Sequence, residues 1–256
     1  MSGRSWVPSR FLAPFKAGRP CVQLFESGED TMVVKVRFWL LFDRREIEVY
    51  ESLGRASEPG FLRLLGHEET GDHQTRIMLT PLLRQMNKWT KVHALAALDR
   101  LRVLHSHGFL HGDVRPANFM ETTGGELILI DFGLALKMDG QGGCDSLVQG
   151  DPAYASWALL SDWMNFFHHF CIADDLEALV HVVFASIQRP TCAPPRYTQL
   201  TDIETIQTHW RSIDSTGFFE CQAAAESGDY DLLQTAMEQW LEVCVSLYSK
   251  FRSALR

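Results

Sequence analysis

The chain has 256 residues, 46 % of them hydrophobic and 22 % charged, a composition typical of a soluble globular protein with room for two lobes. Its net charge of −8 argues against binding to nucleic acid or to acidic membranes. The six cysteines form no CxxC pair, and no apolar run reaches signal-peptide or membrane-spanning length. We therefore expect a cytoplasmic or nuclear protein with no disulfide framework and no nucleic-acid or membrane partner.

The first eighty residues predict strands around a single helix. Residues 31–42 are rich in β-branched and aromatic side chains, which predicts a strand, and 44–54 carry apolar residues at helical spacing before a glycine. Short apolar runs at 61–66 and 75–80 flank a polar segment, which predicts a hairpin. We expect residues 1–82 to form a small β-rich lobe.

Residues 83–256 are expected to form a larger, mostly helical lobe. Apolar residues recur every three positions between 91 and 108 and predict a buried helix that ends at Gly108. They are Val92, Leu95, Leu98, Leu101 and Leu104. Residues 126–131 predict a buried strand, and 174–187 predict an apolar helix whose acidic start suits the helix dipole.

The last predicted helix carries a heptad-like seam of apolar residues. They are Leu233, Met237, Trp240, Cys244, Leu247 and Phe251. A dimerising coiled coil is one interpretation. Because the seam lasts under three heptads, we expect this helix to pack on its own domain. The oligomeric state stays open, with a monomer as the expectation.

An irregular loop, HGFLHGDVRPANFM, lies between a predicted buried helix and a predicted buried strand. It carries Asp113, Arg115 and Asn118 at spacings of two and three, and glycines and a proline break any helical period. A rigid scaffold often presents polar chemistry on such a loop. Asp113 can accept a proton, Arg115 can hold a phosphate, and Asn118 can give an oxygen to a metal. The next strand ends at Asp131, and two such oxygen ligands suit Mg²⁺.

A lysine stands far upstream in an otherwise apolar predicted strand. If Lys35 is buried it needs a partner, and the next predicted helix offers Glu46, Glu48 and Glu51. We favour Glu46 because it matches the helix face E-x-x-x-Y-x-x-L, while the other two stay open. A cation, a metal pair and a carboxylate base together indicate phosphoryl transfer.

Together these motifs resemble those of a protein kinase domain. The matching segments are VVKV at Lys35, REIEVYESL at Glu46, HGDVRPAN at Asp113 and DFGLA at Asp131. Asn118 follows Asp113 by five residues and Asp131 follows it by eighteen, which is the family's spacing. Four motifs in order are a specific signal. GDPAYAS followed by DDLEAL is most similar to the casein kinase 1 branch and to fungal-type kinase domains.

The resemblance implies an α+β, bilobal kinase-like fold that binds Mg·ATP between a small β-rich N-lobe and a helical C-lobe. Lys35 would contact the phosphates and pair with Glu46. The segment LTPLL looks like the hinge, where backbone groups of Thr80 and Leu82 would meet the adenine, while the proline between them has no N–H to offer.

The same resemblance assigns roles to the loop. Asp113 would be the base that accepts the substrate's proton, and Arg115 would stand near the transferring phosphate. Asn118 and Asp131 would bind Mg²⁺. Asp175, at the start of a helix, would brace the loop. The partner would be a protein substrate with an acceptor serine or threonine.

Three features depart from the kinase pattern. The glycine-rich phosphate loop is reduced to Gly18 in FKAGRPCVQLF, so backbone N–H groups have poorer access to phosphates. Asp151 replaces the family's threonine in GDPAY and would repel Asp113 unless Arg115 or a metal neutralises it. An APE motif is missing, as in the casein kinase 1 branch.

Three interpretations follow. The first is an ATP-dependent serine/threonine protein kinase. The second is a pseudokinase that acts as a binding or scaffold module, because of the reduced loop and Asp151. The third is a small-molecule kinase of the aminoglycoside-phosphotransferase type, which shares HGD with an asparagine five residues later. For the cluster of His168, His169 and Cys171 we expect ordinary polar packing rather than a metal site.

Overall fold

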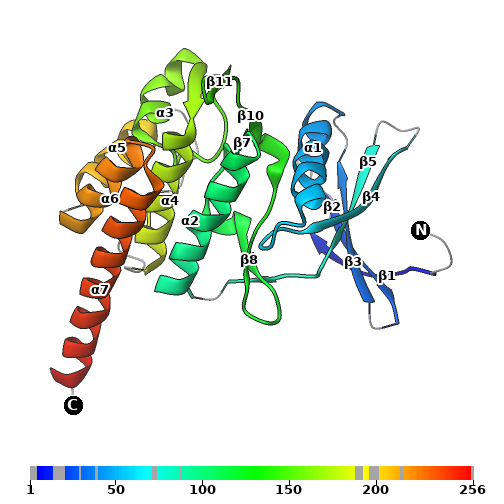
Figure 1. Ribbon diagram of the computed structural model, residues 1–256, viewed down its shortest axis with the longest axis horizontal. Helices are drawn as coiled ribbons and strands as arrows, with labels where there is room; N and C mark the ends of the chain where they lie inside the picture. The colour runs from blue at the N-terminus through cyan, green and yellow to red at the C-terminus, as the bar shows by residue number, and fades with distance from the viewer. Residues whose placement is uncertain are drawn as a thin grey trace. The chain divides into compact units, whose positions relative to one another are not determined.

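The computed structural model shows two compact units, which are described separately (Figure 1). The first comprises Met1–Gln85 and Phe119–Ala135, and the second Met86–Asn118 and Leu136–Arg256. The structure describes residues 5–13, 21–28, 30–37, 40–70, 74–86, 88–187, 193–195, 202–213 and 216–254, without the side chains at 40–43, 216 and 244–254.

An antiparallel sheet with the order β1-β2-β3-β5-β4 forms the body of the first unit. Its strands are β1 (Val7–Ala13), β2 (Cys21–Ser27), β3 (Asp30–Arg37), β4 (Arg63–Thr70) and β5 (Gln74–Thr80). Directly opposed residues lie on the same face of a sheet. Lys35 is opposed by Val22 on one side and Ile77 on the other, so its stem runs among apolar side chains.

The helix of the first unit, α1 (Leu40–Ala56), begins earlier than the sequence predicts. The predicted strand 31–42 ends at Arg37, and residues 40–42 belong to the helix instead. A short apolar run fits a strand or a buried helical turn equally well, so periodicity could not place this boundary. The hairpin at 61–80 is confirmed as β4 and β5, with longer strands than predicted.

A second, smaller sheet brings residues 119–135 into the first unit. Its strands, in the order β6-β8-β9, are β6 (Arg84–Gln85), β8 (Phe119–Glu121) and β9 (Leu127–Leu129). Leu129 also pairs with Phe61, and a short 3-10 helix, η2 (Phe132–Leu134), follows. These pairings explain why the compact units differ from the predicted division after residue 82: the chain returns to the first unit after the loop.

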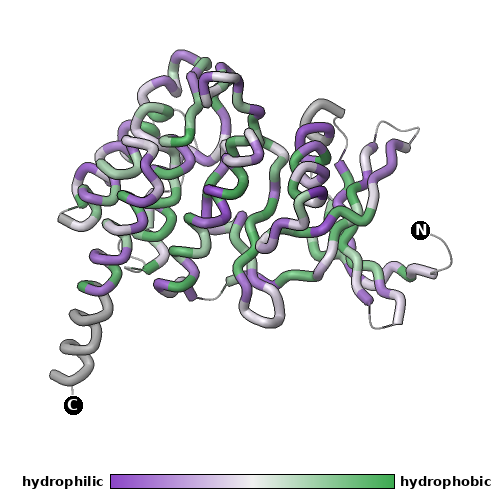
Figure 2. The backbone as a smooth tube through the Cα atoms, in the orientation of Figure 1, coloured by the Kyte–Doolittle hydropathy of each residue, from purple (hydrophilic) through white to green (hydrophobic). Residues whose placement is uncertain are grey.

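The second unit is mainly helical. Its helices are α2 (Lys91–Ser106), α3 (Trp157–Asp162), α4 (Ile172–Ile187), α5 (Asp202–Arg211), α6 (Thr216–Glu226) and α7 (Tyr230–Ala254). Short 3-10 turns are η1 (Pro116–Asn118) and η3 (Trp163–Asn165). Two small antiparallel pairs join β7 (Phe109–Leu110) to β10 (Leu136–Lys137), and β11 (Gly143–Leu147) to β12 (Phe167–Cys171). Residues 174–184 of α4 are all buried, so this hydrophobic helix forms the centre of the unit (Figure 2).

Helix α2 is buried on one side only, which corrects part of the prediction. Leu98, Leu101 and Leu104 are buried as expected, but Val92 is 74 % exposed. A strict three-residue repeat rotates backward around a helix of 3.6 residues per turn, so five such positions cannot share one face. Ala94 and Ala97 complete the buried side. Of the seam predicted in the last helix, Leu233, Met237 and Trp240 are buried within the unit, and the other three positions lie outside the described side chains.

Among the helices that the structure describes, none has both the length and the apolarity needed to span a membrane.

Candidate active site

A cavity of about 250 Å³ lies in the first unit. Its walls are mostly apolar, from strands β1 to β3, helix α1 and residues 79–83, and three charged side chains reach it: Lys35, Glu46 and Asp131. Apolar walls with a few convergent polar groups are the usual pattern of a small-molecule site. Pro81, Leu82 and Leu83 line it on the segment predicted as the hinge.

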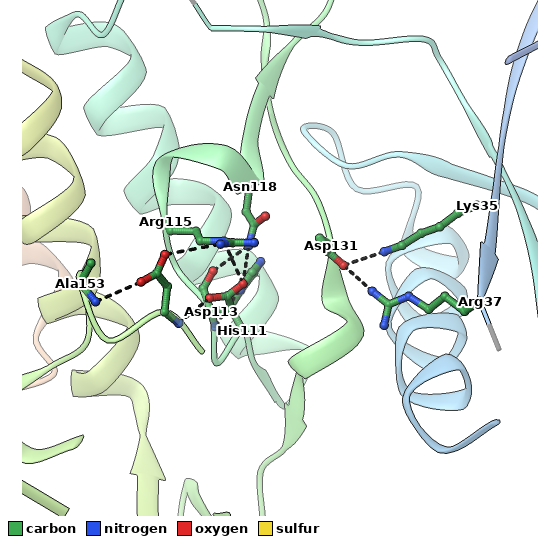
Figure 3. A network of polar contacts seen from close by, with 9 residues as sticks. Lys35, Arg37, His111, Asp113, Arg115, Asn118, Asp131 and Ala153 are labelled. Atoms are coloured by element: carbon green, nitrogen blue, oxygen red, sulfur yellow. Dashed lines mark hydrogen bonds and ion pairs between the residues drawn. The ribbon is translucent and has the colours of Figure 1, made fainter. Parts of the chain in front are cut away.

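The charged side chains at this cavity form what we call the lysine cluster: Lys35, Arg37, Glu46 and Asp131. Lys35 Nζ donates to both carboxylate oxygens of Glu46, at 2.8 and 2.9 Å. It also donates to Asp131 Oδ1 at 2.6 Å (Figure 3). The exposed fraction of the Glu46 side chain is 0 %. A carboxylate buried so completely needs a cation, and this pairing settles the choice among the three glutamates that the sequence left open.

Arg37 is the member of the cluster that the sequence interpretation missed. Its Nη2 donates to Asp131 Oδ1 at 2.9 Å, and its Nε lies 3.7 Å from Glu46 Oε2. Lys35 and Arg37 stand two residues apart on β3, and successive side chains on a strand alternate between faces. Both cations therefore project from the same face, and this period-two spacing was the signal available in the sequence.

Asp131 is held in place by its neighbours in the chain and by aromatic packing. Its backbone is left-handed, with φ 66° and ψ 69°, which aspartate tolerates better than most residues. Phe132 is fully buried and packs edge-on against Tyr50, with ring centroids 5.1 Å apart, and also against Phe61. Burial raises the pKa of the Tyr50 hydroxyl well above its usual value, helped by the charges of Glu46 and Asp131.

In the second unit, Asp113, Arg115, Asn118 and Asp151 form what we call the loop cluster. Asn118 Nδ2 donates to the Asp113 carbonyl at 2.8 Å and to its Oδ2 at 3.1 Å (Figure 3). The backbone N–H of Asp151 donates to the other carboxylate oxygen of Asp113 at 2.9 Å. Arg115 forms ion pairs with both acids, at 3.1 Å to Asp113 and 3.4 Å to Asp151. The repulsion expected between the two aspartates is therefore offset by Arg115.

The environment of Asp113 raises the pKa of its carboxyl. Burial raises the pKa of its carboxyl, while Arg115, His111 and the hydrogen bond from Asn118 lower it in part. The net direction is upward, so the carboxylate is a stronger base than an exposed aspartate.

The loop is braced by Asp175 at the start of α4, as predicted. Its Oδ2 accepts from the backbone N–H of His111 at 2.5 Å and from His105 Nε2 at 2.9 Å, and its Oδ1 accepts from the N–H of Gly112 at 3.0 Å. Burial alone would raise the pKa of Asp175, but the hydrogen bonds and charges of His105 and His111 outweigh it and hold the pKa below its usual value. His105 also contacts the Tyr230 hydroxyl.

A glycine allows the close approach behind the loop. A Cβ at Gly150 would stand 2.6 Å from the carbonyl oxygen of Gly112, and its φ of +92° is one that side chains disfavour. The contact places the segment containing Asp151 directly against Asp113.

The remaining predicted positions have different outcomes. Thr80 ends β5 opposite Arg63, and its hydroxyl donates to the Thr31 carbonyl. Recognition of adenine by the backbone groups of Thr80 and Leu82 stays a prediction. Gly18 lies outside the described residues. His168 is hydrogen-bonded to Asp162 and Asp174, and His169 to Asp145. No cluster of three potential metal-ligating acids, histidines or cysteines occurs within the described part of the chain.

Comparison with known proteins gives local sequence matches to kinases and a match in fold along most of the chain. No family model matches. Rho-associated protein kinase 1 of Homo sapiens is 39 % identical over 71 residues, which is 27 % of this chain and 5 % of that protein. The Saccharomyces cerevisiae serine/threonine-protein kinase PKH3 is 37 % identical over 51 residues, 20 % of this chain and 6 % of that protein. The matched segments thus span about one twentieth of these curated relatives.

Among solved structures, the kinase PK-1 of Cydia pomonella granulovirus matches with a TM-score of 0.66. The match covers 89 % of this chain and 92 % of the viral chain at 15 % sequence identity. The predicted α+β kinase-like fold is confirmed, whereas the similarity to the casein kinase 1 branch stays a prediction. Fold and local sequence similarity together support a kinase.

Proposed function

We propose that this chain, which has the fold of a protein kinase, transfers the γ-phosphate of ATP to serine or threonine hydroxyls of a protein. The observation that carries the proposal is the loop cluster. A carboxylate of raised pKa is held by an amide and an arginine of the same short loop and by the backbone N–H of Asp151. Phosphoryl transfer needs little covalent chemistry from the protein beyond such positioning.

In this proposal Asp113 orients the acceptor hydroxyl and takes its proton as the oxygen attacks the γ-phosphorus. Arg115 balances the charge of Asp113 and stands ready to pair with the transferring phosphate, which its 36 % exposed side chain permits. Asp175 fixes the backbone of the loop, while Asn118, the Asp151 N–H and Arg115 orient the Asp113 carboxylate itself.

The cavity of the first unit fits a nucleotide. Its apolar walls suit adenine, and the Lys35 ammonium, fixed by Glu46, suits the α- and β-phosphates. Leu82 lies at the cavity wall, where its backbone would meet the base. Lys35 and Glu46 are thus the proposed nucleotide-binding pair.

For Mg²⁺ the proposed ligands are Asn118 and Asp131. Asn118 fits, because both of its donor contacts go to Asp113 and its side-chain oxygen is turned away from them (Figure 3). Asp131 fits less well, because one of its oxygens already accepts from Lys35 and Arg37. When bound, the ion would neutralise phosphate charge.

The test is transfer of labelled phosphate from γ-labelled ATP to casein and to the chain itself, followed by phosphoamino-acid analysis. We expect phosphoserine or phosphothreonine. Label only in small hydroxyl or amino compounds offered alongside would instead identify a small-molecule kinase. ATP binding without label in any acceptor would contradict the proposed transfer.

A second candidate is a pseudokinase that binds nucleotide without transferring phosphate. The pairing of Asp131 with two cations favours it, because one oxygen of the carboxylate that would bind the metal already accepts from both of them. The same labelling experiment separates the two functions.

A further inference from the structure

The lysine cluster contains one cation more than a single Lys–Glu pair needs. Asp131 Oδ1 accepts from Lys35 Nζ at 2.6 Å and from Arg37 Nη2 at 2.9 Å, so two positive charges converge on one carboxylate oxygen (Figure 3). The exposed fraction of the Arg37 side chain is 18 %, and that of Asp131 is 31 %. The site is therefore partly shielded from water. Charge pairs in such a site are stronger than pairs on an open surface.

The position of the Arg37 guanidinium depends on a glycine. A Cβ at Gly133 would stand 2.4 Å from both terminal nitrogens of Arg37 and 2.7 Å from its Cζ. The guanidinium thus lies close against Gly133, two residues after Asp131, in space that the side chain of any other residue would fill. Gly133 has no left-handed φ, so its lack of a side chain serves this contact rather than the backbone conformation.

The charges of the cluster are balanced without a metal. Lys35 and Arg37 contribute two positive charges, and Glu46 and Asp131 contribute two negative charges. A divalent cation approaching Asp131 must either displace Arg37 or lie beside it, and like charges at that range repel. Arginine is always protonated in proteins, so deprotonation cannot remove this competition.

We propose that Arg37 substitutes for the divalent cation at Asp131, so that this chain binds nucleoside triphosphate with little dependence on Mg²⁺. The inference rests on the proposed nucleotide site and defines its ligand as the metal-free nucleotide. Arg37 keeps Asp131 neutralised while Lys35 holds the phosphates. If a metal is required at all, it is required for phosphate transfer and not for ATP binding. Binding of the metal to Asp131 would then require Arg37 to move away.

The experiment measures ATP affinity by calorimetry in EDTA and in Mg²⁺ for wild type, Arg37→Gln and Gly133→Ala. In wild type we expect the two dissociation constants to agree within about threefold, since the cluster is already neutral. In Arg37→Gln we expect Mg²⁺ to tighten binding by roughly tenfold or more, because one fewer cation competes with the metal at Asp131. Lys35 still pairs with both carboxylates in this variant, so neither is left unpaired.

Gly133→Ala provides a second variant that keeps every charge. Its new methyl group requires the guanidinium to move, and the far end of a flexible side chain moves at low cost. We expect it to raise the Mg²⁺ dependence in the same direction as Arg37→Gln. Arg44→Gln is the matched control, because Arg44 is exposed on α1 and its loss also removes one positive charge. We expect it to behave as wild type. Direct Mn²⁺ binding, followed by electron paramagnetic resonance in the presence of ATP, should rise in the first two variants and not in the third.

Equal Mg²⁺ dependence in wild type and Arg37→Gln would overturn the inference. Failure of wild type to bind ATP in either buffer would overturn it too, together with the proposed nucleotide site. If the expected binding pattern is found but no acceptor is labelled, the proposed transfer fails and the inference about Arg37 stands.

Discussion

The lysine cluster and the loop cluster use the same kinds of side chain but differ in their charge balance. In the lysine cluster two carboxylates meet two cations, and the charges cancel. In the loop cluster two carboxylates share the single cation of Arg115, which leaves a net negative charge around the base. A base works when it can still accept a proton, whereas a metal ligand works when a cation can still reach it.

The two clusters therefore differ in what they can still bind. In our proposal the loop cluster supplies the base, with its hydrogen bonds and its brace on α4. In the lysine cluster, we propose that Arg37 holds Asp131 in place of a metal. We therefore expect transfer chemistry and nucleotide chemistry to respond differently to mutation, and the predictions below test this from the largest expected effect to the smallest.

Lys35→Met should break the lysine cluster. It leaves Glu46 fully buried without its hydrogen-bonded cation, which we expect to cost roughly 3–5 kcal/mol of stability and to abolish ATP binding. Thermal unfolding and calorimetry measure both effects. The double variant Lys35→Met/Glu46→Gln should regain stability but not binding. If the double variant bound ATP as wild type does, Lys35 would not be the phosphate ligand.

Asp175→Asn should loosen the loop cluster from behind. The carboxylate accepts from N–H groups of His111, Gly112 and His105. An asparagine amide has only one oxygen, so its NH₂ group would face some of these N–H donors. We expect a loss of about 2–3 kcal/mol in stability and slower transfer, with ATP affinity unchanged. Chemical denaturation and labelling rates are the measurements. A fall in ATP affinity equal to the fall in transfer would show that the clusters do not respond separately.

Glu177→Gln tests a buried carboxylate on α4 that accepts hydrogen bonds from neutral donors. Its Oε1 accepts from the Trp157 N–H and from Gln222, both at 3.0 Å, and burial raises its pKa to about 7. A pKa raised on folding favours the native state at low pH and loses that contribution as pH rises through 7. Glutamine accepts the same hydrogen bonds without ionising.

The variant should therefore be more stable than wild type at pH 8, by up to about 3 kcal/mol, and this advantage should shrink as the pH falls toward 4.5. Melting temperatures of the two proteins across this range give the difference directly. A constant difference would show that Glu177 does not titrate with a raised pKa.

Arg115→Gln should have the smallest effect, on the pH dependence of transfer. Burial raises the pKa of Asp113 and the charge of Arg115 opposes this rise, so removing Arg115 raises the pKa further. Asp113 must be deprotonated to act as a base. The acid limb of the rate profile should consequently move to higher pH in the variant, and an unmoved limb would remove Asp113 as the titrating base.

Much of this arrangement could be predicted from the sequence, because motif spacing fixes which groups share a loop. The positions of Asp113, Asn118 and Asp131 and the brace from Asp175 follow from local motifs. Arg37 was missed, because its role depends on a partner 94 residues away and on the space left at Gly133. The predicted boundary between strand and helix near residue 40 was wrong, because a short apolar run fits either element. The predicted burial of Val92 was wrong, because a strict three-residue repeat does not stay on one face of a helix.

The most direct test of the account is phosphate transfer by wild type beside Asp113→Asn, after calorimetry has established that both bind ATP equally. The account predicts labelled serine or threonine with wild type and a rate lower by roughly 10²–10⁴ in the variant, the usual contribution of a general base. Equal rates in the two proteins, or no label from a wild type that binds ATP, would contradict it.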